Sequence, residues 1–457
     1  MLDASSSTKH NDLKQATFHF ADWLVSPPTN TISRVEIRRQ MEPRAMDVLV
    51  ALCSRAGTVI SAEELLQLCW GTTLFGDNPV HKVIAQLRSV LGDDTKAPIY
   101  IETIRKRGYR TVADVRLATD SQLVSATESW YGKSPFRGLQ PFVEEYAQVF
   151  FGRSDATAKL LHAVAGNAER AHAITLVLGP SGSGKTSLIR AGLLPKLMRV
   201  QDNEESLHVA SATTFDLADM GEHQLFAALG SALIDWQIGD GDVNIFPGAS
   251  GASLGQRLVQ DIESVVIELQ NVLIDMHKQG THRRVALFVD RFEAIFASPH
   301  ISASERDTFI NVLDRLARSN AVVVIVACRN DFYPHIAQHE LLMEGKAHGG
   351  HFDLSPPTTA EIAQIIRSPA HAAQLTFGID AKSHARLDDV LCESASGSPD
   401  ALPLLQYTLQ ELYRLRSEND ELSFEAFHHL GGVEGALGRR ADEVVEALSE
   451  DQRKSLP

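Results

Sequence analysis

The stretch from residue 174 to 187, ITLVLGPSGSGKTS, contains the residues whose spacing most clearly predicts chemistry. Its glycines allow the chain to curl so that successive backbone N–H groups face the phosphates of a nucleotide. Lys185 would neutralise the β and γ phosphates, and the hydroxyl of Thr186 would reach Mg²⁺. The sequence therefore predicts a P-loop that binds ATP or ADP with Mg²⁺, formed by Gly179, Ser181, Gly182, Ser183, Gly184, Lys185, Thr186 and Ser187.

A second apolar stretch, VALFVDRFEAIF, would place a carboxylate beside that loop. A buried strand that ends at Asp290 can present its carboxylate to Mg²⁺-bound water, so we expect Thr186 and Asp290 to hold the metal. Glu293 is the nearest acid that could orient the attacking water, and a solvated acid on a helix is an equal alternative for it. Another apolar strand ends at Arg329, which is placed to sense the γ-phosphate. The predicted catalytic residues are Lys185, Asp290, Glu293 and Arg329.

Residues 80–91, VHKVIAQLRSVL, form a candidate site of another kind. At helical spacing one stripe is apolar, and the opposite stripe holds Lys82, Ala85, Gln86 and Ser89. A helix in the major groove of DNA needs this arrangement, because Gln86 can pair with an adenine edge and Lys82 with guanine. His81 and Arg88 flank that stripe and suit phosphates. The alternative is an ordinary amphipathic helix with a solvated face.

The segment that follows favours the DNA-binding alternative. Residues 99–115 predict a β-hairpin with its turn at 106–108, and its tip is cationic. A cationic tip suits phosphates or a minor groove. The predicted DNA-binding residues are His81, Lys82, Gln86, Arg88, Ser89, Arg105, Lys106, Arg107 and Tyr109, with Arg110 on the same hairpin.

The net charge of −15 over 457 residues argues at first against nucleic acid as a partner. The charge is unevenly distributed, since residues 1–115 carry 14 Lys/Arg against 13 Asp/Glu and the remainder carries 29 against 45. Local basic surface decides DNA contact, so the acidic bulk does not exclude it.

No apolar run approaches the roughly 18 residues that span a bilayer, and the polar start lacks the apolar core of a secretion signal. The four cysteines lie in apolar segments without metal-ligand spacing, which predicts buried free thiols in a reducing compartment. We therefore expect a cytoplasmic protein without a membrane partner.

The elements that must position these residues fall into two patterns. Strands at 16–25 and 33–38, helices at 44–57, at 61–71 and from 78 onward, and the basic hairpin describe a winged helix. From about 135, apolar strands alternate with helices, which indicates a parallel α/β sheet. From about 357 the pattern is mostly helical.

The predicted fold is therefore multidomain. Its parts are a disordered tail (1–14), an α+β winged-helix DNA-binding domain (15–115) and a linker (116–133). They are followed by an α/β P-loop NTPase domain with a parallel sheet (134–356), a helical lid domain (357–418) and the start of a small winged-helix-like domain (419–457).

The amino-terminal part resembles the OmpR-type winged-helix family of transcription regulators over roughly residues 18–115. The residues that carry the resemblance are EPRAMDVLVAL, SAEELLQLCWG, NPVHKVIAQLRSVLGDD and YIETIRKRGYR. The family often has a basic pair after the leucine of the recognition helix, where this chain has Arg88-Ser89. The resemblance implies double-stranded DNA as a partner, with a weaker phosphate grip at that point.

The remainder, about 134–457, resembles the novel STAND NTPases, which are AAA+-related signal-transduction ATPases. The resemblance rests on SPFRGLQPFVEEYAQVFFGR, the P-loop, VDRFEAIF, ACRNDF and GSPDALPLLQYTLQELY. It implies that Phe151, Gly152 and Arg153 lie near adenine and that Pro399 closes over the nucleotide. The family often has Gln and a second Glu where this chain has Arg291 and Ala294, which implies inefficient hydrolysis.

The leading hypothesis is an ATP-dependent transcription regulator with a slow ATPase as its switch. Its partners would be double-stranded DNA, RNA polymerase and, in the ATP state, further copies of the chain. A second hypothesis is a STAND-type signalling or defence ATPase whose winged helix contacts a protein. A third is a scaffold that binds DNA constitutively and makes no use of nucleotide.

Overall fold

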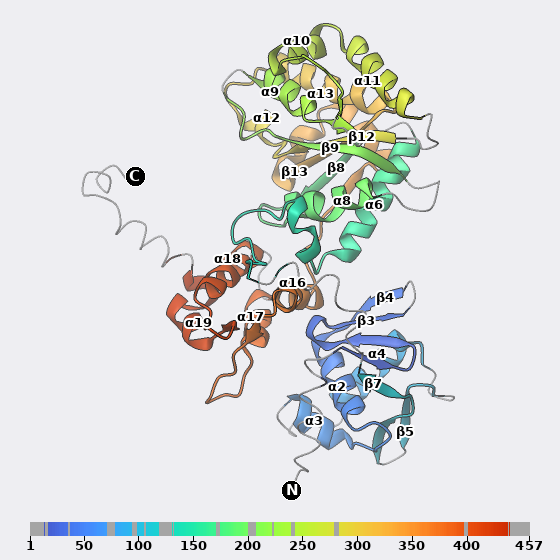
Figure 1. Ribbon diagram of the computed structural model, residues 1–457, viewed down its shortest axis with the longest axis vertical. Coiled ribbons are helices and arrows are strands. Elements are labelled where there is room, and N and C mark those ends of the chain that lie inside the picture. The colour runs from blue at the N-terminus through green and yellow to red at the C-terminus, as the bar shows by residue number, and fades with distance from the viewer. Residues whose placement is uncertain are drawn as a thin grey trace, which may run out of the picture. The chain divides into compact units, whose positions relative to one another are not determined.

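The computed structural model describes residues 13, 17–34, 37–70, 78–93, 98–104, 107–117, 130, 132–170, 174–199, 207–221, 224–238, 243–277, 283–396, 401–436 and 438. The chain forms two compact units (Figure 1). One unit comprises residues 1–139 and 357–457, and the other comprises residues 140–356. Each unit is described by itself.

The amino-terminal part of the first unit begins with an antiparallel sheet in the order β4-β3-β2-β1-β7. The single strand expected at 16–25 is a hairpin, because Ala21 adopts φ +52 and Phe20 pairs with Trp23. The strand expected at 33–38 likewise spans two paired strands. The strands are β1 (Phe18–Phe20), β2 (Trp23–Ser26), β3 (Thr31–Arg34), β4 (Ile37–Gln40) and β7 (Val115–Leu117), with a short helix η1 (Pro27–Thr29).

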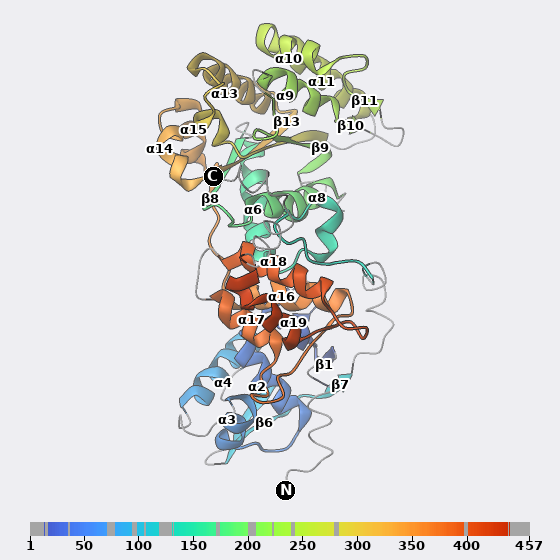
Figure 2. The same cartoon turned by 90° about the vertical axis from the view of Figure 1, so that its left-hand side faces the viewer.

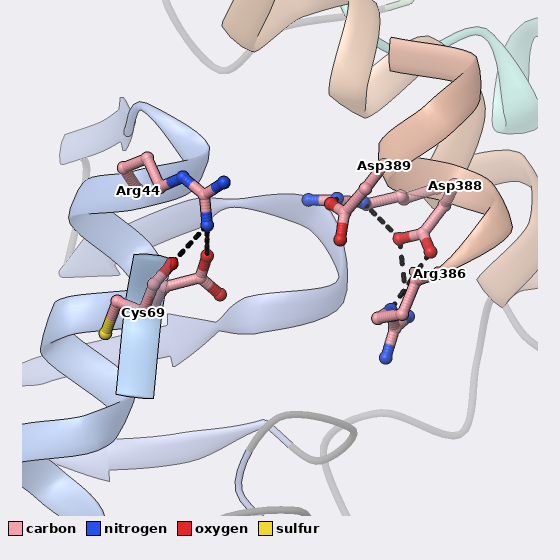
Figure 3. Close-up of polar contacts among 7 residues, drawn as sticks. Arg44, Cys69, Arg386, Asp388 and Asp389 are labelled. Atoms are coloured by element: carbon pink, nitrogen blue, oxygen red, sulfur yellow. Dashed lines mark hydrogen bonds and ion pairs between the residues drawn. The ribbon is translucent and has the colours of Figure 1, made fainter. Parts of the chain in front are cut away.

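Three helices and a second hairpin complete this part, as the sequence predicted. They are α2 (Pro43–Ser54), α3 (Ala62–Trp70), α4 (Asn78–Leu91), β5 (Ile101–Ile104) and β6 (Gly108–Thr111). Ser61 and Glu64 exchange hydrogen bonds of 3.1 and 3.0 Å that begin α3. Arg44 of α2 donates to the carbonyl of Cys69, which ties α2 to α3 (Figure 3).

The second unit is built on a parallel five-stranded sheet in the order β14-β8-β13-β12-β9. The strands are β8 (Ile174–Gly179), β9 (His208–Asp216), β12 (Arg283–Asp290), β13 (Val322–Arg329) and β14 (His351–Asp353). Alternate residues of β12 and β13 belong to two separate cores, one on each face of the sheet. A parallel sheet covered on both faces requires such continuous apolar strands.

Helices cover both faces of this sheet (Figure 1). One face packs against α6 (Ser154–Glu169) and α8 (Leu194–Met198). The other packs against α9 (Leu225–Ile234), α10 (Gly251–Gln260), α11 (Ile262–His277) and α13 (Ala303–Arg318). Shorter elements are η3 (Glu144–Val149), α7 (Lys185–Ser187), η4 (Leu188–Leu193), β10 (Gln237–Ile238), β11 (Val243–Asn244), α12 (Ala294–Ala297), η5 (Asn330–Phe332), α14 (Tyr333–Ile336), α15 (Glu340–Glu344) and η6 (Gly345–His348).

The carboxy-terminal part of the first unit is helical, as expected from 357 onward. Figure 2 shows α16 (Thr359–Ala372), α17 (Leu387–Ser396), α18 (Ala401–Arg414) and α19 (Phe424–Leu430) packed together, and β15 (Thr376–Phe377) pairs with β16 (Glu421–Leu422). Their core also takes in Phe136.

A buried ion-pair network stabilises these helices (Figure 3). Asp388, which is 1% exposed, pairs with Arg367 at 2.6 Å and with Arg386 at 3.0 Å. Burial alone would raise the pKa of Asp388, but the two guanidinium groups hold that pKa below its usual range.

All four cysteines are buried and free, which confirms that part of the sequence expectation. Among the described residues, no helix combines the length and the apolar character that crossing a membrane requires.

Candidate functional site

The predicted P-loop connects β8 to the helix that begins at Lys185. Gly182 and Gly184 adopt φ +74 and +87, a backbone region that side chains other than glycine rarely occupy. A Cβ atom on Gly179 would lie 2.8 Å from the hydroxyl of Ser183. The glycine spacing thus produces the curled loop, and Ser183 is nearly buried within it.

The ammonium group of Lys185 lies across this loop. Nζ donates hydrogen bonds to the carbonyl oxygens of Gly179 at 2.8 Å and Pro180 at 2.9 Å. Burial lowers the pKa of Lys185, and the negative charges of Glu293 and Asp290 oppose that shift. The lysine is therefore positioned at the loop by the fold itself, close enough to both acids to feel their charge.

Thr186 and Asp290 come together although they are 104 positions apart in the chain. Thr186 Oγ1 donates to Asp290 Oδ2 at 2.7 Å, and the backbone N–H of Arg291 donates to Asp290 Oδ1 at 2.9 Å. Asp290 is 4% exposed, and burial raises its pKa. A hydroxyl and a carboxylate are hard oxygen donors, so this pair fits Mg²⁺.

Glu293 is tied to the end of the neighbouring strand. Its Oε2 accepts a hydrogen bond from the backbone N–H of Arg329 at 3.2 Å. This contact favours a place in the site over the alternative of a solvated acid on a helix. The guanidinium of Arg329 pairs with Asp331 at 2.6 Å and lies over the ring of Phe332. Arg329 thus has partners on its own turn. The γ-phosphate sensing expected of it stays a prediction.

The segment that contains Phe151, Gly152 and Arg153 reaches the P-loop helix. Upstream of these residues, the N–H of Phe142 donates to Ser187 Oγ at 3.0 Å, and Glu144 pairs with Arg190 at 2.7 Å. Arg153 is 6% exposed and donates to the carbonyl of Ser355 at 2.8 Å. The segment is therefore fixed beside the loop. Pro399 lies outside the described residues, so its expected closure over the nucleotide stays a prediction.

Sequence reasoning missed two acids at the same edge of the sheet. Asp216, the last residue of β9, is the register partner of Asp290, and Asp219 follows shortly after it. Both pair with the guanidinium of Arg291, at 2.6 Å for Nε to Asp216 and 2.7 Å for Nη2 to Asp219. An alternating strand that ends in Asp, HVASATTFD, was the available signal.

The helix α4 carries the predicted DNA-contact face. Its apolar stripe is buried as expected, and Val80, Ile84, Leu87 and Leu91 are each at most 1% exposed. His81, Lys82 and Ser89 are exposed, and Gln86 is half-buried. Arg107 at the hairpin is exposed, whereas Arg105 and Lys106 lie outside the described residues.

Three residues of the predicted DNA-contact set have partners inside the domain. Arg88 donates to the carbonyl of Ile101 at 2.9 Å and to Thr103 Oγ1 at 2.8 Å, so it holds the hairpin against α4. Tyr109 is only 4% exposed and belongs to the core, and its hydroxyl is hydrogen-bonded to His81. This residue of the hairpin therefore faces the core, and the DNA contact expected of Tyr109 stays a prediction.

Known families match both parts of the chain. Residues 36–111 match the family model "Transcriptional regulatory protein, C terminal", and residues 135–457 match "Novel STAND NTPase 1". The chain is 36% identical over 104 residues to the transcriptional activator CadC of Escherichia coli, which covers 22% of this chain and 20% of CadC. It is 28% identical over 172 residues to the cholera toxin transcriptional activator of Vibrio cholerae, covering 37% of this chain and 54% of that protein.

The solved structure of the DNA-binding domain of E. coli CadC is 33% identical to this chain in the matched region, with a TM-score of 0.21. The match covers 23% of this chain and 98% of the CadC domain. The chain spans only a fifth to about half of the length of the two curated relatives. The NTPase model, by contrast, covers well over half of this chain. The protein therefore belongs to the novel STAND NTPase 1 family, joined to an OmpR-type winged helix of transcriptional regulators.

Proposed function

We propose that this protein is a transcription regulator whose state is set by ATP or ADP bound at the P-loop. The winged helix, proposed to span 15–115, binds double-stranded DNA. The NTPase domain, proposed to span 134–356, binds the nucleotide with Mg²⁺, and residues 357–418 act as its helical lid. Buried free cysteines suit the reducing cytoplasm as its place of action.

The contact between Thr186 and Asp290 is the observation that carries the nucleotide part of this proposal. The hydroxyl of Thr186, just after the loop, lies 2.7 Å from the carboxylate of Asp290. Asp290 ends β12, which is two strands away from β8 in the sheet. A carboxylate as buried as Asp290 is costly to take out of water, and such groups cluster at functional sites. Together Thr186 and Asp290 would hold Mg²⁺, which when bound neutralises charge on the β and γ phosphates.

The other residues of the site have complementary roles in the proposal. Backbone N–H groups of the loop and the ammonium of Lys185 bind the phosphates, while the segment around Phe151 and Gly152 faces the base. Glu293 follows β12, and its carboxylate accepts a hydrogen bond from the backbone N–H of Arg329 at the end of β13. From this position Glu293 orients the attacking water. Arg329 senses the γ-phosphate when it exchanges Asp331 for the phosphate oxygens.

Hydrolysis is slow in this proposal, because few groups are available to position water. Ala294 is apolar, and the guanidinium of Arg291 is occupied by Asp216 and Asp219. Glu293 alone would activate the nucleophile. A long-lived ATP state suits a switch, since the state must outlast an encounter with DNA and RNA polymerase.

The exposed face of α4 supports the DNA part of the proposal. Lys82 and Ser89 are exposed and Gln86 is half-buried on the face opposite the core, as a helix in the major groove requires. The relatives named above are transcriptional activators by name. In the ATP state we expect self-association of the chain, which would bring two winged helices onto paired sites and raise DNA affinity.

Three measurements on the full chain test the proposal: sedimentation, DNA binding, and steady-state hydrolysis, the first two with ADP and with a non-hydrolysable ATP analogue. A nucleotide can shift the protein only by its different affinity for two states. We expect a larger sedimentation coefficient and tighter specific DNA binding with the analogue. We also expect turnover below about 10 s⁻¹, the median of ordinary enzymes.

Different results would favour the other hypotheses. Identical sedimentation and DNA affinity in both nucleotide states would rule out the switch. Specific DNA binding without measurable nucleotide binding would indicate the constitutive scaffold. Nucleotide-dependent assembly without any specific footprint would indicate a signalling ATPase whose winged helix contacts a protein.

A further inference from the structure

Arg291 follows Asp290 directly and has an unusual backbone conformation. Its φ of +51 lies in the left-handed region that residues with a side chain seldom adopt. In this conformation its N–H donates to Asp290 Oδ1 at 2.9 Å, and the N–H of the next residue, Phe292, donates to the carbonyl of Ala327 at 2.9 Å. The turn after β12 is therefore fixed from both sides, and a strained residue at such a place calls for a reason.

The side chain of Arg291 supplies that reason. Its guanidinium donates hydrogen bonds to both carboxylate oxygens of Asp216, from Nε to Oδ1 at 2.6 Å and from Nη2 to Oδ2. Nη2 also lies 2.7 Å from Asp219 Oδ1, and the N–H of Ala218 donates to Asp216 Oδ1 at 3.0 Å. A bidentate arginine–carboxylate pair is stronger and more directional than a single hydrogen bond between neutral groups. Both carboxylate oxygens of Asp216 thereby have a donor, and the nearer charge to them is that of Arg291.

Without Arg291, this edge of the sheet would present two carboxylates side by side. The strands β9 and β12 are parallel neighbours whose last residues, Asp216 and Asp290, are register partners. Register partners on neighbouring strands project from the same face of a sheet. Two adjacent carboxylates repel each other and form the oxygen donor set that divalent cations prefer.

We propose that Arg291 is a positioning residue that confines the divalent cation to Thr186 and Asp290 by keeping Asp216 occupied. The inference rests on the proposed nucleotide function and adds to it a cause for the metal's location. The guanidinium is a tethered positive charge at the point where a second cation would otherwise bind. Asp290 is left with the Thr186 hydroxyl as its partner on the side of the P-loop.

The test uses Mn²⁺ as probe on the full chain without nucleotide, with free Mn²⁺ followed by electron paramagnetic resonance. Arg291→Gly keeps the left-handed backbone, which glycine adopts freely, and removes the side chain with its guanidinium. We expect Arg291→Gly to bind Mn²⁺ at least tenfold more tightly than the unmodified chain. The double variant Asp216→Asn with Arg291→Gly should return to the unmodified value, because the extra donor is gone.

Three further variants sharpen the comparison. Arg291→Lys keeps the charge but cannot cover both oxygens of Asp216, so an intermediate rise in Mn²⁺ affinity is expected. Asp219→Asn removes the second partner only and should leave Mn²⁺ binding unchanged. Arg318→Ala is the matched control, since Arg318 also pairs with two acids, Asp314 and Glu344, but lies near the amino end of β13. This variant should leave Mn²⁺ affinity unchanged.

The proposal is overturned if Arg291→Gly and Arg291→Lys both bind Mn²⁺ as the unmodified chain does. It is also overturned if the double variant keeps the Arg291→Gly behaviour, which would point to a purely structural role for Arg291. Failure of the proposed function is a separate result, because it would appear as absent MgATP binding by the unmodified chain, measured by calorimetry. The Mn²⁺ comparison is made without nucleotide and remains decisive in that case.

Discussion

The P-loop region and the exposed face of α4 hold their charged side chains in opposite ways. Around the P-loop, Lys185, Asp290 and Glu293 each have a hydrogen-bond partner within the site. On α4, Lys82 and Ser89 extend into solvent, and the neighbouring Arg88 is turned inward to the hairpin. The side chains of the first region are paired with groups of the same site, whereas the second region leaves its polar groups in water.

The proposed function accounts for the difference by what each proposed partner supplies. A nucleotide brings several negative charges into a small pocket, so the site must hold its own charges in place beforehand, at a cost in desolvation. DNA brings a long surface whose phosphates and base edges provide partners for exposed side chains. Substitutions should therefore have large and local effects in the first region and smaller, graded effects in the second.

The largest effect is expected for Lys185→Ala. Loss of the ammonium at the loop should reduce MgATP affinity at least tenfold, because a charge-assisted contact to the phosphates disappears. Isothermal titration calorimetry measures this directly. Lys196→Ala is the control, since it removes an exposed lysine further along the same helical run, in α8. Unchanged MgATP affinity in Lys185→Ala, with an unaltered melting curve, would contradict the assignment of the loop.

An intermediate effect is expected for Lys82→Ala and Gln86→Ala. Each should weaken binding to a preferred DNA sequence by about 1–3 kcal/mol while changing affinity for unrelated DNA little. Arg107→Ala should instead weaken binding to all DNA and lower its salt slope by about one unit. Competition binding at several salt concentrations separates these patterns. If all three variants bind every DNA as the unmodified chain does, α4 has another partner.

The smallest effect on DNA contact, and a distinct effect on stability, is expected for Arg88→Ala. Two hydrogen bonds to the hairpin are lost, so the winged helix should lose about 1–2 kcal/mol of unfolding free energy. Denaturant unfolding gives this number, and Arg88→Lys should recover only part of it because an ammonium lacks the planar fork. If the variant keeps full stability but loses much of its DNA affinity, Arg88 acts mainly as a contact to DNA phosphate and not as a support of the hairpin.

Particular elements show how much of the fold the sequence could predict. The helices from 43, 62 and 78 were found because their caps and apolar spacing are local properties. The hairpin between β1 and β2 was missed, because a turn at Ala21 and Asp22 barely disturbs an alternating pattern. The burial of Tyr109 was missed for a similar reason, since a hairpin face is assigned only when the sheet packs on its core.

The sequence by itself determined the P-loop, because the glycine spacing fixes a local backbone shape that needs no distant partner. It also determined the apolar stripe of α4 and the strand that ends at Asp290. Only the tertiary structure decided that Asp290 meets Thr186 and that Arg291 meets Asp216, 75 positions away. Such pairs depend on the order and register of strands, which are set by how both faces of the sheet pack against their helices. No local pattern in the chain contains that information.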